Sequence, residues 1–423
     1  MAAPAPKPVL VAPTAKDRDI LRRLATQWRE ITESPRCAWN REQWRRLADL
    51  EGSERPLVAV IPEGATTEFI AGMQLECTDT HARDTERGLR LRLKHWHEIG
   101  DDTPWMPFHD VSMNVSNSGY GVEIPSQHGA DRGSMVWTAP LTDLARDLPK
   151  LRHREWTIDR QTEEAKVAWA EAAFGDLLPV RAVSSLWWTL GLTWEVIKLV
   201  GLQPLMTLMY DDPDHLHELM AWMRDDHHLM IDWYAREKLL FQHHFSSPIG
   251  SGGYGPTKSL GTHPIGVDPS QMVGFSESQE TVGVSPKLFA QFILPYQIPL
   301  LERFGLNYYG CCEPLHQRIE HVLKIPRLRF LSSSPWCDDQ KLAPRLGRDY
   351  VIMKKPNPAP VCVGFNEVAI REDLRRTLAT AKDSHLAFIM KDTHTIENQP
   401  DRLGRWTRIA REEIDNALAV TAG

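Results

Sequence analysis

The sequence predicts an α/β protein: a (β/α)8 TIM-type barrel with an N-terminal α/β extension. The chain has 423 residues, which is too long for one small domain but suits such a barrel with an extension. Its last third alternates strand and helix patterns four times, with strand starts about 20–35 residues apart, the size of one βα unit. This alternation predicts a parallel sheet with right-handed crossovers. A doubly wound open sheet is the alternative fold, but its usual glycine-rich dinucleotide turn is missing.

The N-terminal part divides into a leader and a region with few regular patterns. Residues 1–15 are rich in proline, which predicts a disordered leader. Residues 16–154 are expected to contribute helices at 16–31 and 84–97 and at least one barrel strand, at 55–61. The stretch 100–140 is rich in turn-forming residues and poor in periodicity, so no element is predicted there.

Residues 155–423 carry the patterns of the barrel itself. Apolar residues three and four positions apart predict helices, and short runs of β-forming residues predict strands. The predicted helices are 162–174, 213–234, 285–304, 314–324, 338–346, 366–381 and 402–418, and the predicted strands are 177–183, 306–312, 327–332, 350–354 and 386–391. Ser285 and Pro286 mark the start of one helix, as its N-cap and first helical position.

The composition argues against several classes of protein. The chain has 49 basic and 56 acidic residues and a net charge of −7, which argues against a nucleic-acid binder and a polybasic membrane-surface protein. No apolar run approaches the roughly 18 residues of a transmembrane helix. Six cysteines are too few for a disulfide framework, so we expect reduced thiols and a cytoplasmic protein. Fifteen tryptophans point to aromatic-lined surfaces or pockets.

The carboxyl ends of the predicted strands gather most of the reactive side chains. In a barrel of this kind the chemistry lies at those ends. Side chains alternate along a strand, so Tyr309, Cys311 and Glu313 are expected to point one way and Cys312 the other. Cys311 then has two open interpretations, as a metal ligand or thiolate and as a small buried apolar residue, whereas Cys312 is expected only to pack.

These strand ends supply the candidate site. We predict metal ligation by Cys311 and His394 with Glu313, or Glu277 in its place, because thiolate and imidazole suit zinc better than magnesium. The catalytic candidates are Tyr309, Glu277, Asp392 and Lys354, and the substrate-binding candidates are Trp336, Asn357 and Lys355. Structural alternatives stay open: a capping role for Glu277, a solvated strand end for the two lysines, and a structural role for His394.

The last third of the chain resembles the uroporphyrinogen decarboxylase superfamily. The resemblance lies in residues 284–296 (VSPKLFAQFILPY) and in the run YYGCCEPLH at 308–316, and it extends well over 267–420. The arginine motif R-Q-A-G-R of the decarboxylases is absent, since residues 55–63 read RPLVAVIPE. The chain is therefore more similar to the zinc- and corrinoid-dependent methyltransferases. Tyr309 stands in their zinc-ligating histidine position, and His394 falls near their later cysteine.

The resemblance implies a metal-assisted methyltransferase. It would move a methyl group from a small O-, N- or S-methyl compound to a thiol or to a corrinoid carried by a separate partner protein, with zinc as the expected metal. One alternative is a metal-independent decarboxylase or lyase of a small carboxylate. Another is a non-catalytic binder of small molecules. The sequence makes no prediction of the oligomeric state.

Overall fold

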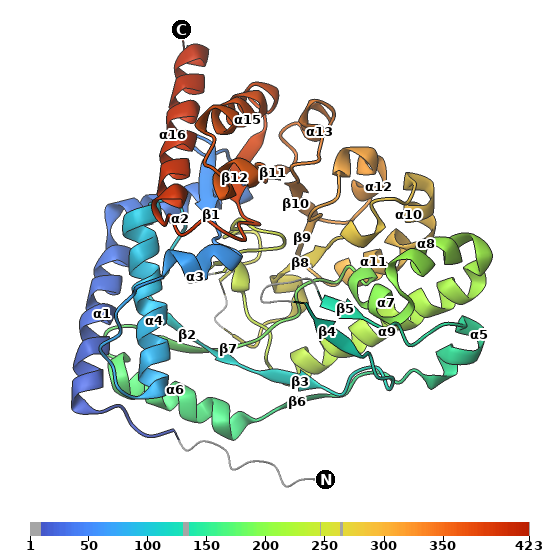
Figure 1. Ribbon diagram of the computed structural model, residues 1–423, viewed down its shortest axis with the longest axis horizontal. Coiled ribbons are helices and arrows are strands. Elements are labelled where there is room, and N and C mark those ends of the chain that lie inside the picture. The colour runs from blue at the N-terminus through green and yellow to red at the C-terminus, as the bar shows by residue number, and fades with distance from the viewer. Residues whose placement is uncertain (1–9, 130–134, 246, 263–264, 423) are drawn as a thin grey trace.

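The computed structural model describes residues 10–129, 135–245, 247–262 and 265–422 (Figure 1). Residues 1–9 of the predicted leader lie outside this described part. Residue Val11 is held against the fold, because its carbonyl accepts a hydrogen bond from Trp169 Nε1 at 2.9 Å. Among the described residues, no helix is both long enough and apolar enough to cross a membrane.

A six-stranded parallel sheet forms the centre of the molecule. Its strands, in spatial order, are β1 (Leu57–Val60), β12 (His385–Met390), β11 (Val351–Lys354), β10 (Leu328–Ser333), β9 (Leu306–Tyr309) and β8 (Val273–Ser276). Every neighbouring pair is parallel. Most residues of these strands are buried, as expected for a parallel sheet covered on both faces. The predicted α/β class and the strands near 55–61 and in the last third are therefore confirmed.

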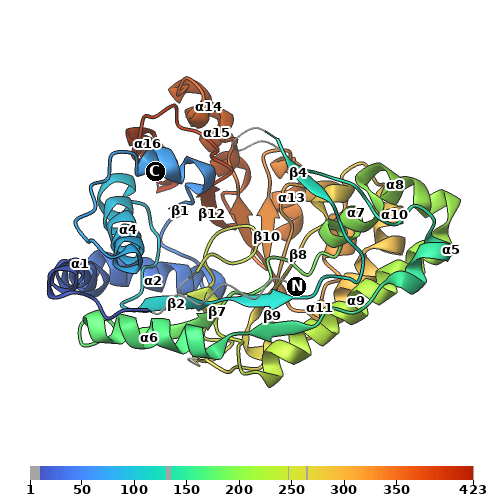
Figure 2. The same ribbon diagram turned by 60° about the horizontal axis from the view of Figure 1, so that its bottom comes forward.

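The remaining strands form three two-stranded sheets. β2 (His109–Met113) and β7 (Val180–Ser184) are parallel and lie along α6 (Arg160–Phe174), as Figure 2 shows. β3 (Val115–Asn117) pairs with β6 (Trp156–Ile158), and β4 (Ser126–His128) pairs with β5 (Met135–Trp137), both antiparallel. Four of these strands fall within 100–140, where the sequence predicted nothing. In the described part of the chain, no strand pairing joins β2 and β7 to the six-stranded sheet.

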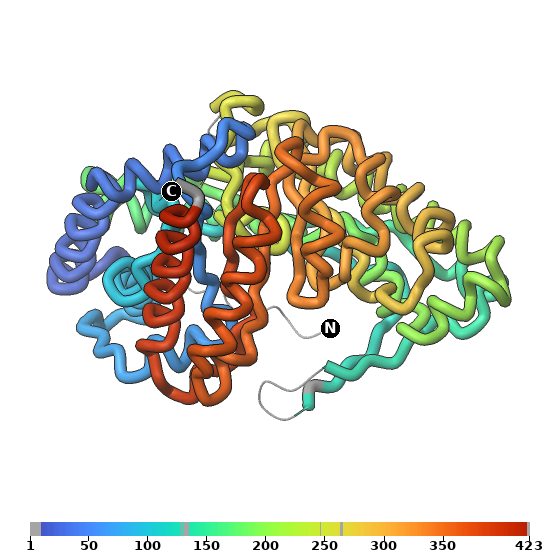
Figure 3. The backbone as a smooth tube through the Cα atoms, turned by 90° about the horizontal axis from the view of Figure 1, so that it is seen from above, coloured from blue at the N-terminus to red at the C-terminus, as the bar shows by residue number. Residues whose placement is uncertain are grey.

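Helices surround the sheet and carry clear start signals. The longer ones are α1 (Ala15–Glu33), α2 (Pro35–Ala48), α4 (Thr80–Lys94), α6, α8 (Leu202–Asp211), α9 (Pro213–Arg236), α15 (Glu367–Thr380) and α16 (Asp401–Ala422). The shorter ones are α3 (Thr66–Phe69), α5 (Leu144–Asp147), α7 (Thr193–Val200), α10 (Pro286–Phe292), α11 (Leu294–Leu301), α12 (Ile319–Val322), α13 (Asp339–Leu346) and α14 (Ala359–Cys362). Ser285 caps α10 by accepting from the Leu288 amide, as predicted. Figure 3 shows α15 and α16 side by side.

One predicted helix is divided in two. The pattern at 285–304 predicted a continuous helix, but α10 ends at Phe292 and α11 begins at Leu294. Pro295, near the start of α11, has no amide hydrogen to donate to the preceding turn, and proline is favoured in the first turn of a new helix. The break follows from this proline.

The two faces of the six-stranded sheet have different coverings. On one face, which we call the loop face, Ala59, Phe275, Tyr308, Met353 and Ile389 form a buried cluster with residues of the segment 247–262. A Cβ atom added at Gly250 in that segment would lie 2.5 Å from the Tyr308 ring, so only glycine fits this approach. On the other, the helix face, alternate residues such as Ile352 and Phe388 pack in the cluster that contains the surrounding helices.

Buried histidines make the fold sensitive to acid. His227 and His244 are almost fully buried, and burial is the main cause that lowers the pKa of each to about 3. In the unfolded chain a histidine gains its proton near pH 6.5. We expect stability to fall below that pH by roughly 1.4 kcal/mol per pH unit for each histidine, because only the unfolded state takes up the protons.

Urea unfolding between pH 7 and pH 5 would measure this slope. The His244→Phe variant removes one of these histidines. It should therefore reduce the pH dependence of the free energy of unfolding by roughly 1.4 kcal/mol per pH unit. Neither ring nitrogen of His244 has a hydrogen-bond partner among the described residues, so its replacement should not weaken the fold at pH 7. The His394→Ala variant serves as a control, since that side chain is exposed. A wild-type stability that does not change over this range would contradict the prediction.

Candidate functional site

Two adjacent thiols lie beyond the carboxyl end of β9. β9 ends at Tyr309, and Gly310 follows with a φ of 98°, a conformation that favours glycine. The chain therefore turns before Cys311, whereas the prediction extended the strand to residue 312. As a result, Tyr309 packs on the helix face and Cys311 in the loop-face cluster. The predicted common direction of Tyr309 and Cys311 is wrong.

A short network surrounds the two thiols. The Sγ atoms of Cys311 and Cys312 lie 3.7 Å apart. Ser251 Oγ donates to Cys311 Sγ at 3.1 Å, and Lys355 Nζ lies 2.8 Å from Ser251 Oγ and 3.7 Å from Cys311 Sγ. Cys311 is buried, and Cys312 is half-buried. We call Cys311, Cys312, Ser251 and Lys355 the thiol cluster.

The two thiols differ in their acidity. The hydrogen bond from Cys311 lowers the pKa of Cys312 to about 7, against the effect of burial, and the Lys355 ammonium lowers it further. The same hydrogen bond, together with burial, raises the pKa of Cys311. Cys312 is therefore the more acidic of the two thiols, and a substantial part of it is thiolate at neutral pH. A cysteine thiolate is the nucleophilic and metal-binding form of the residue.

A second cation lies at the end of β12. Lys391 comes two residues after Ile389 and lies on the same loop face. Its Cδ atom lies 3.4 Å from the position that a Cβ atom would take if Gly252 carried a side chain. Its Nζ lies 3.1 Å from Glu63 Oε1, and Glu63 Oε2 accepts a hydrogen bond from the Asp392 amide at 2.6 Å. Burial opposes the charge of Lys391, but the neighbouring carboxylates of Glu63 and Asp392 raise its pKa. Lys391 is therefore a cation beside the thiol cluster.

Glu313 joins the ends of two strands. One carboxylate oxygen accepts from the Cys311 amide at 2.8 Å, and the other accepts from the Ser278 amide at 3.0 Å. This buried carboxylate fixes the turn that carries the thiols. Its contacts make Glu313 a positioning residue for Cys311, which is a different role from the predicted metal ligation.

The predicted zinc ligands do not come together. His394 is exposed, and its backbone lies against Gly64. Throughout the residues that the structure describes, no group of three or more His, Cys, Asp and Glu side chains is arranged to hold a metal ion. The set Cys311, His394 and Glu313 therefore does not fit a zinc shell, which needs at least three protein ligands.

The other predicted residues occupy three different environments. Lys354 points to the helix face and pairs with Asp339 of α13 at 2.7 Å, so of the two neighbouring lysines only Lys355 reaches the thiols. Trp336 is 74% exposed. Asn357 is exposed, and its Oδ1 accepts from the Ala359 amide. No hydrogen bond joins these three residues to the thiol cluster in the described part of the chain.

Glu277 lies in a buried group of carboxyl groups beyond β8. Burial, followed by the neighbouring Glu280 and Glu313, raises the pKa of Glu277 well above the usual value and so favours its protonated form. One oxygen accepts from the Gln279 amide, and the other has no hydrogen-bond partner among the described residues. Glu277 is therefore a buried acid, not a simple helix cap.

Two tryptophan-lined cavities lie along the segment that follows β7. One, of about 270 Å³, is lined in part by Trp156, Trp187, Trp188 and Trp194. The other, of about 250 Å³, shares Trp187 and Trp188 and reaches Gly250, the residue before Ser251. The tryptophan count pointed to such pockets, but the sequence could not locate them.

Comparison with models of protein families and with curated proteins finds no match for this chain. The resemblance to the uroporphyrinogen decarboxylase superfamily therefore stays a prediction.

The thiol cluster predicts a measurable pH dependence of alkylation. We expect iodoacetamide to modify Cys312 with a midpoint near pH 7, because only the thiolate reacts. The midpoint should rise in Cys311→Ala, which removes the main cause of the lowered pKa, and rise less in Lys355→Met. Cys337 is the internal control, since burial raises its pKa. Peptide mass spectrometry across pH 5–10 would measure all of these rates, and faster modification of Cys337 than of Cys312 at pH 7 would contradict the prediction.

Proposed function

We propose that this protein is an enzyme that transfers a methyl group from a small methylated compound, with Cys312 as the thiolate that receives it. The observation that carries the proposal is the thiol cluster, in which a lysine ammonium lies beside two adjacent thiols at the ends of parallel strands and the pKa of Cys312 is lowered to about 7. The cytoplasm, where thiols stay reduced, is the compartment that suits this chemistry.

The proposed step is a substitution at the methyl carbon. The Cys312 thiolate attacks that carbon, a new S–C bond forms, and the bond from the methyl group to the donor atom breaks with its electron pair moving to that atom. A sulfonium or ammonium donor leaves as a neutral molecule, whereas an oxygen donor must also gain a proton. In the second step a free thiol, attacking as its thiolate after losing its proton to solvent, forms a bond to the methyl carbon; the bond from that carbon to Cys312 Sγ breaks, and its electron pair restores the Cys312 thiolate. A corrinoid delivered by a partner protein would be the alternative acceptor.

The residues around the thiols would position the substrate and tune its reaction. Lys391 supplies positive charge for an anionic group of the substrate. Trp187 and Trp188 line the cavity that reaches Gly250, and their rings suit the apolar or cationic body of a methylated compound. Lys355 and Ser251 act through Cys311 and are positioning residues in this scheme.

We further propose that the strands close into the eight-stranded barrel predicted from the sequence. β1 and β8 are the edges of the six-stranded sheet. The Asp102 amide donates to the Val58 carbonyl of β1, and the Leu190 amide donates to the Phe275 carbonyl of β8. Asp102 precedes β2 and Leu190 follows β7, so both contacts support the pair β2–β7 as the closing strands. An experimental structure with β2 beside β1 and β7 beside β8 would test this closure.

A second function, as a decarboxylase or lyase of a small carboxylate, is favoured by a different observation. Lys355 and Lys391 present two ammonium groups at the ends of β11 and β12, and cations at such a site bind carboxylates. In that reaction the carbon–carbon bond breaks, CO2 leaves, and the electron pair left on carbon takes up a proton. Glu277, whose raised pKa favours the protonated form, would supply that proton.

Assays with labelled compounds separate these functions. The protein is incubated with isotopically labelled methyl sulfonium, methylammonium and methoxy donors, with and without methyl acceptors, and the Cys311–Cys312 peptide is examined by mass spectrometry. We expect a labelled methyl group on Cys312 that a thiol or corrinoid acceptor removes. Release of CO2 from a carboxylate without an acceptor would favour the second function. A compound that raises the melting temperature but is not converted would indicate a non-catalytic binder. The Cys362→Ala variant, outside the thiol cluster, is the matched control.

A further inference from the structure

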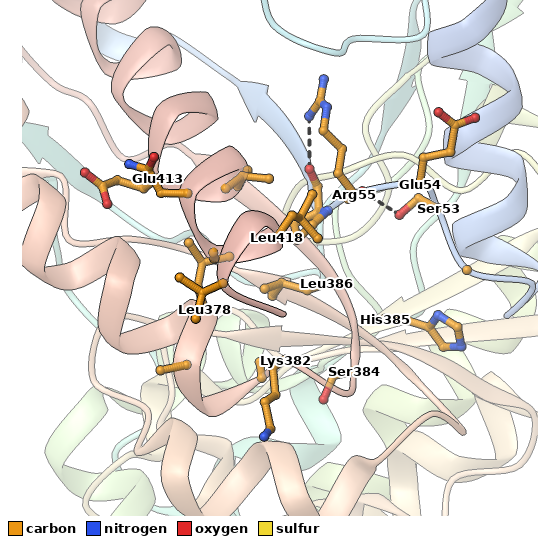
Figure 4. Close-up of a pocket in the computed structure, with 18 of the residues that line it drawn as sticks. Ser53, Glu54, Arg55, Leu378, Lys382, Ser384, His385, Leu386, Glu413 and Leu418 are labelled. Carbon is orange, nitrogen blue, oxygen red and sulfur yellow. Dashed lines mark hydrogen bonds between the residues drawn. The ribbon is translucent and has the colours of Figure 1, made fainter. Parts of the chain in front are cut away.

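The largest of the cavities described here lies at the opposite end of the sheet from the thiol cluster. It has a volume of about 820 Å³ and opens where β1 and β12 begin. Residues 52–56, the first residues of β12, the end of α15 and the last turns of α16 line it (Figure 4). Its volume lies in the usual range for small-molecule sites, which is roughly 300–1,000 Å³.

One part of the cavity wall is apolar. Leu378 of α15, Leu386 of β12 and Leu418 of α16 gather in the centre of Figure 4, and Ile414 also lines the cavity. Leu378 and Leu386 are almost fully buried, whereas Leu418 is 40% exposed and lies at the open side. A hydrocarbon chain in this space would cover the exposed leucine.

The charged residues of the wall are mostly cationic. Four cations, Arg55, Arg348, Arg375 and Lys382, line the cavity together with two acids, Glu54 and Glu413. Arg375 already pairs with Glu413, and Arg55 pairs with Asp102, outside the cavity. Arg348 and Lys382 form no ion pair or side-chain hydrogen bond within the described residues. Two cations of the cavity wall therefore lie beside its apolar part without an ion-pair partner, whereas the Glu54 carboxylate is held by hydrogen bonds from Trp39 and Gln43.

A buried neutral histidine completes the polar side. His385 is the first residue of β12. Its ring and the Arg348 guanidinium both lie next to Gly52, at 3.7 Å and 3.4 Å from the position that a Cβ atom would take there. Burial, followed by the charges of Arg348 and Arg329, lowers the pKa of His385. The ring therefore lines the polar side of the cavity without adding charge, and its hydrogen bond to the Arg348 backbone holds it there.

We propose that this cavity binds an alkyl carboxylate, with the chain against Leu378, Leu386 and Leu418 and the carboxylate on the side of Arg348 and Lys382. This inference is independent of the proposed function, because the cavity lies at the amino ends of the strands. Such an occupant would bridge α15, α16 and β12 in the folded state only. It would therefore stabilise the folded protein without competing at the thiol cluster.

The test is titration of the full chain with decanoate. Isothermal titration calorimetry measures the affinity, and thermal unfolding measures the change in melting temperature. Three comparison compounds separate the contribution of the alkyl chain from that of the charge: decanol has no charge, decyltrimethylammonium has the opposite charge, and acetate lacks the long alkyl chain. We expect decanoate to bind and to raise the melting temperature, with decanol and the cationic compound weaker and acetate without effect.

Three variants locate the binding. The double variant Arg348→Ala/Lys382→Ala should weaken decanoate binding about fivefold to tenfold, since each exposed ion pair contributes only modestly. Both side chains are exposed, so the fold should be retained. Ala379→Trp, at an exposed position that lines the cavity, should fill the space and abolish binding. Lys324→Ala removes an exposed lysine outside the cavity and should leave the affinity unchanged.

Two results would overturn the proposal. If decanol or decyltrimethylammonium binds as tightly as decanoate, the cations play no part. If Ala379→Trp binds decanoate with wild-type affinity, the binding lies elsewhere. Alkylation of Cys312, measured in the same samples, reports separately on the thiol cluster, so that failure of either proposal is distinguishable from failure of the other.

Discussion

Replacing Cys312 with serine is expected to lower the rate of methyl transfer on the order of a thousandfold or more, because an alcohol with ordinary acidity is a far weaker nucleophile than a thiolate. The pKa of Cys312, near 7, keeps the wild-type residue largely reactive at neutral pH. The pH profile of the rate should follow the alkylation profile of the same residue. Single-turnover transfer of a labelled methyl group would measure the effect.

The neighbouring thiol should behave differently. Cys311→Ser keeps a hydrogen-bond donor beside Cys312, so we expect a smaller loss of rate together with a shift of the pH midpoint. Cys337→Ser changes a buried thiol outside the cluster and should leave the rate unchanged if the fold is retained. Full activity in Cys312→Ser would rule out Cys312 as the nucleophile, and a larger loss in Cys311→Ser would transfer that role to Cys311.

The second large effect concerns stability. Asp102 is a buried carboxylate that accepts hydrogen bonds from Arg55, Arg411 and the Val58 amide of β1. We expect Asp102→Ala to destabilise the fold by about 3–5 kcal/mol, because it leaves two partly buried guanidinium groups and a buried amide without their acceptor. Urea unfolding at pH 7 would measure the loss.

A matched control for Asp102 is available on the surface. Asp84 pairs with Arg87 within α4, and both side chains are largely exposed. Asp84→Ala should change the free energy of unfolding by less than about 1 kcal/mol. A similar small change in Asp102→Ala would show that the carboxylate is not needed to hold β1 in place.

The strands of the last third could be predicted from the sequence because each is a short apolar run followed by a helical pattern. The directions of the side chains just beyond the strand ends could not be predicted in the same way. The alternation rule assumes a continuing strand, and the positive φ of Gly310 ends β9 before Cys311. The glycine directly before the two cysteines is the sequence signal for this turn.

Other parts of the site depend on contacts between distant segments. Ser251 reaches Cys311 across a loop, and Glu63 reaches Lys391 from the other end of the chain. Nothing in the local pattern around any of these residues indicates its partner. The choice between Lys354 and Lys355 is different, since Met353 and Lys355 share a face of the sheet, and the alternation rule applied from Met353 selects Lys355.

The pairing of β1 with β12 also has a consequence for synthesis on the ribosome. Leu57 lies beside Ala387, so the first strand of the central sheet cannot find its partner until almost the whole chain has been translated. At about 5–20 residues per second, that delay lasts roughly 15–70 s. During this time β1 presents an unpaired apolar edge, which is the kind of segment that chaperones bind. We therefore expect folding of the nascent chain to be completed only after release of its C-terminal helix, α16, from the ribosome.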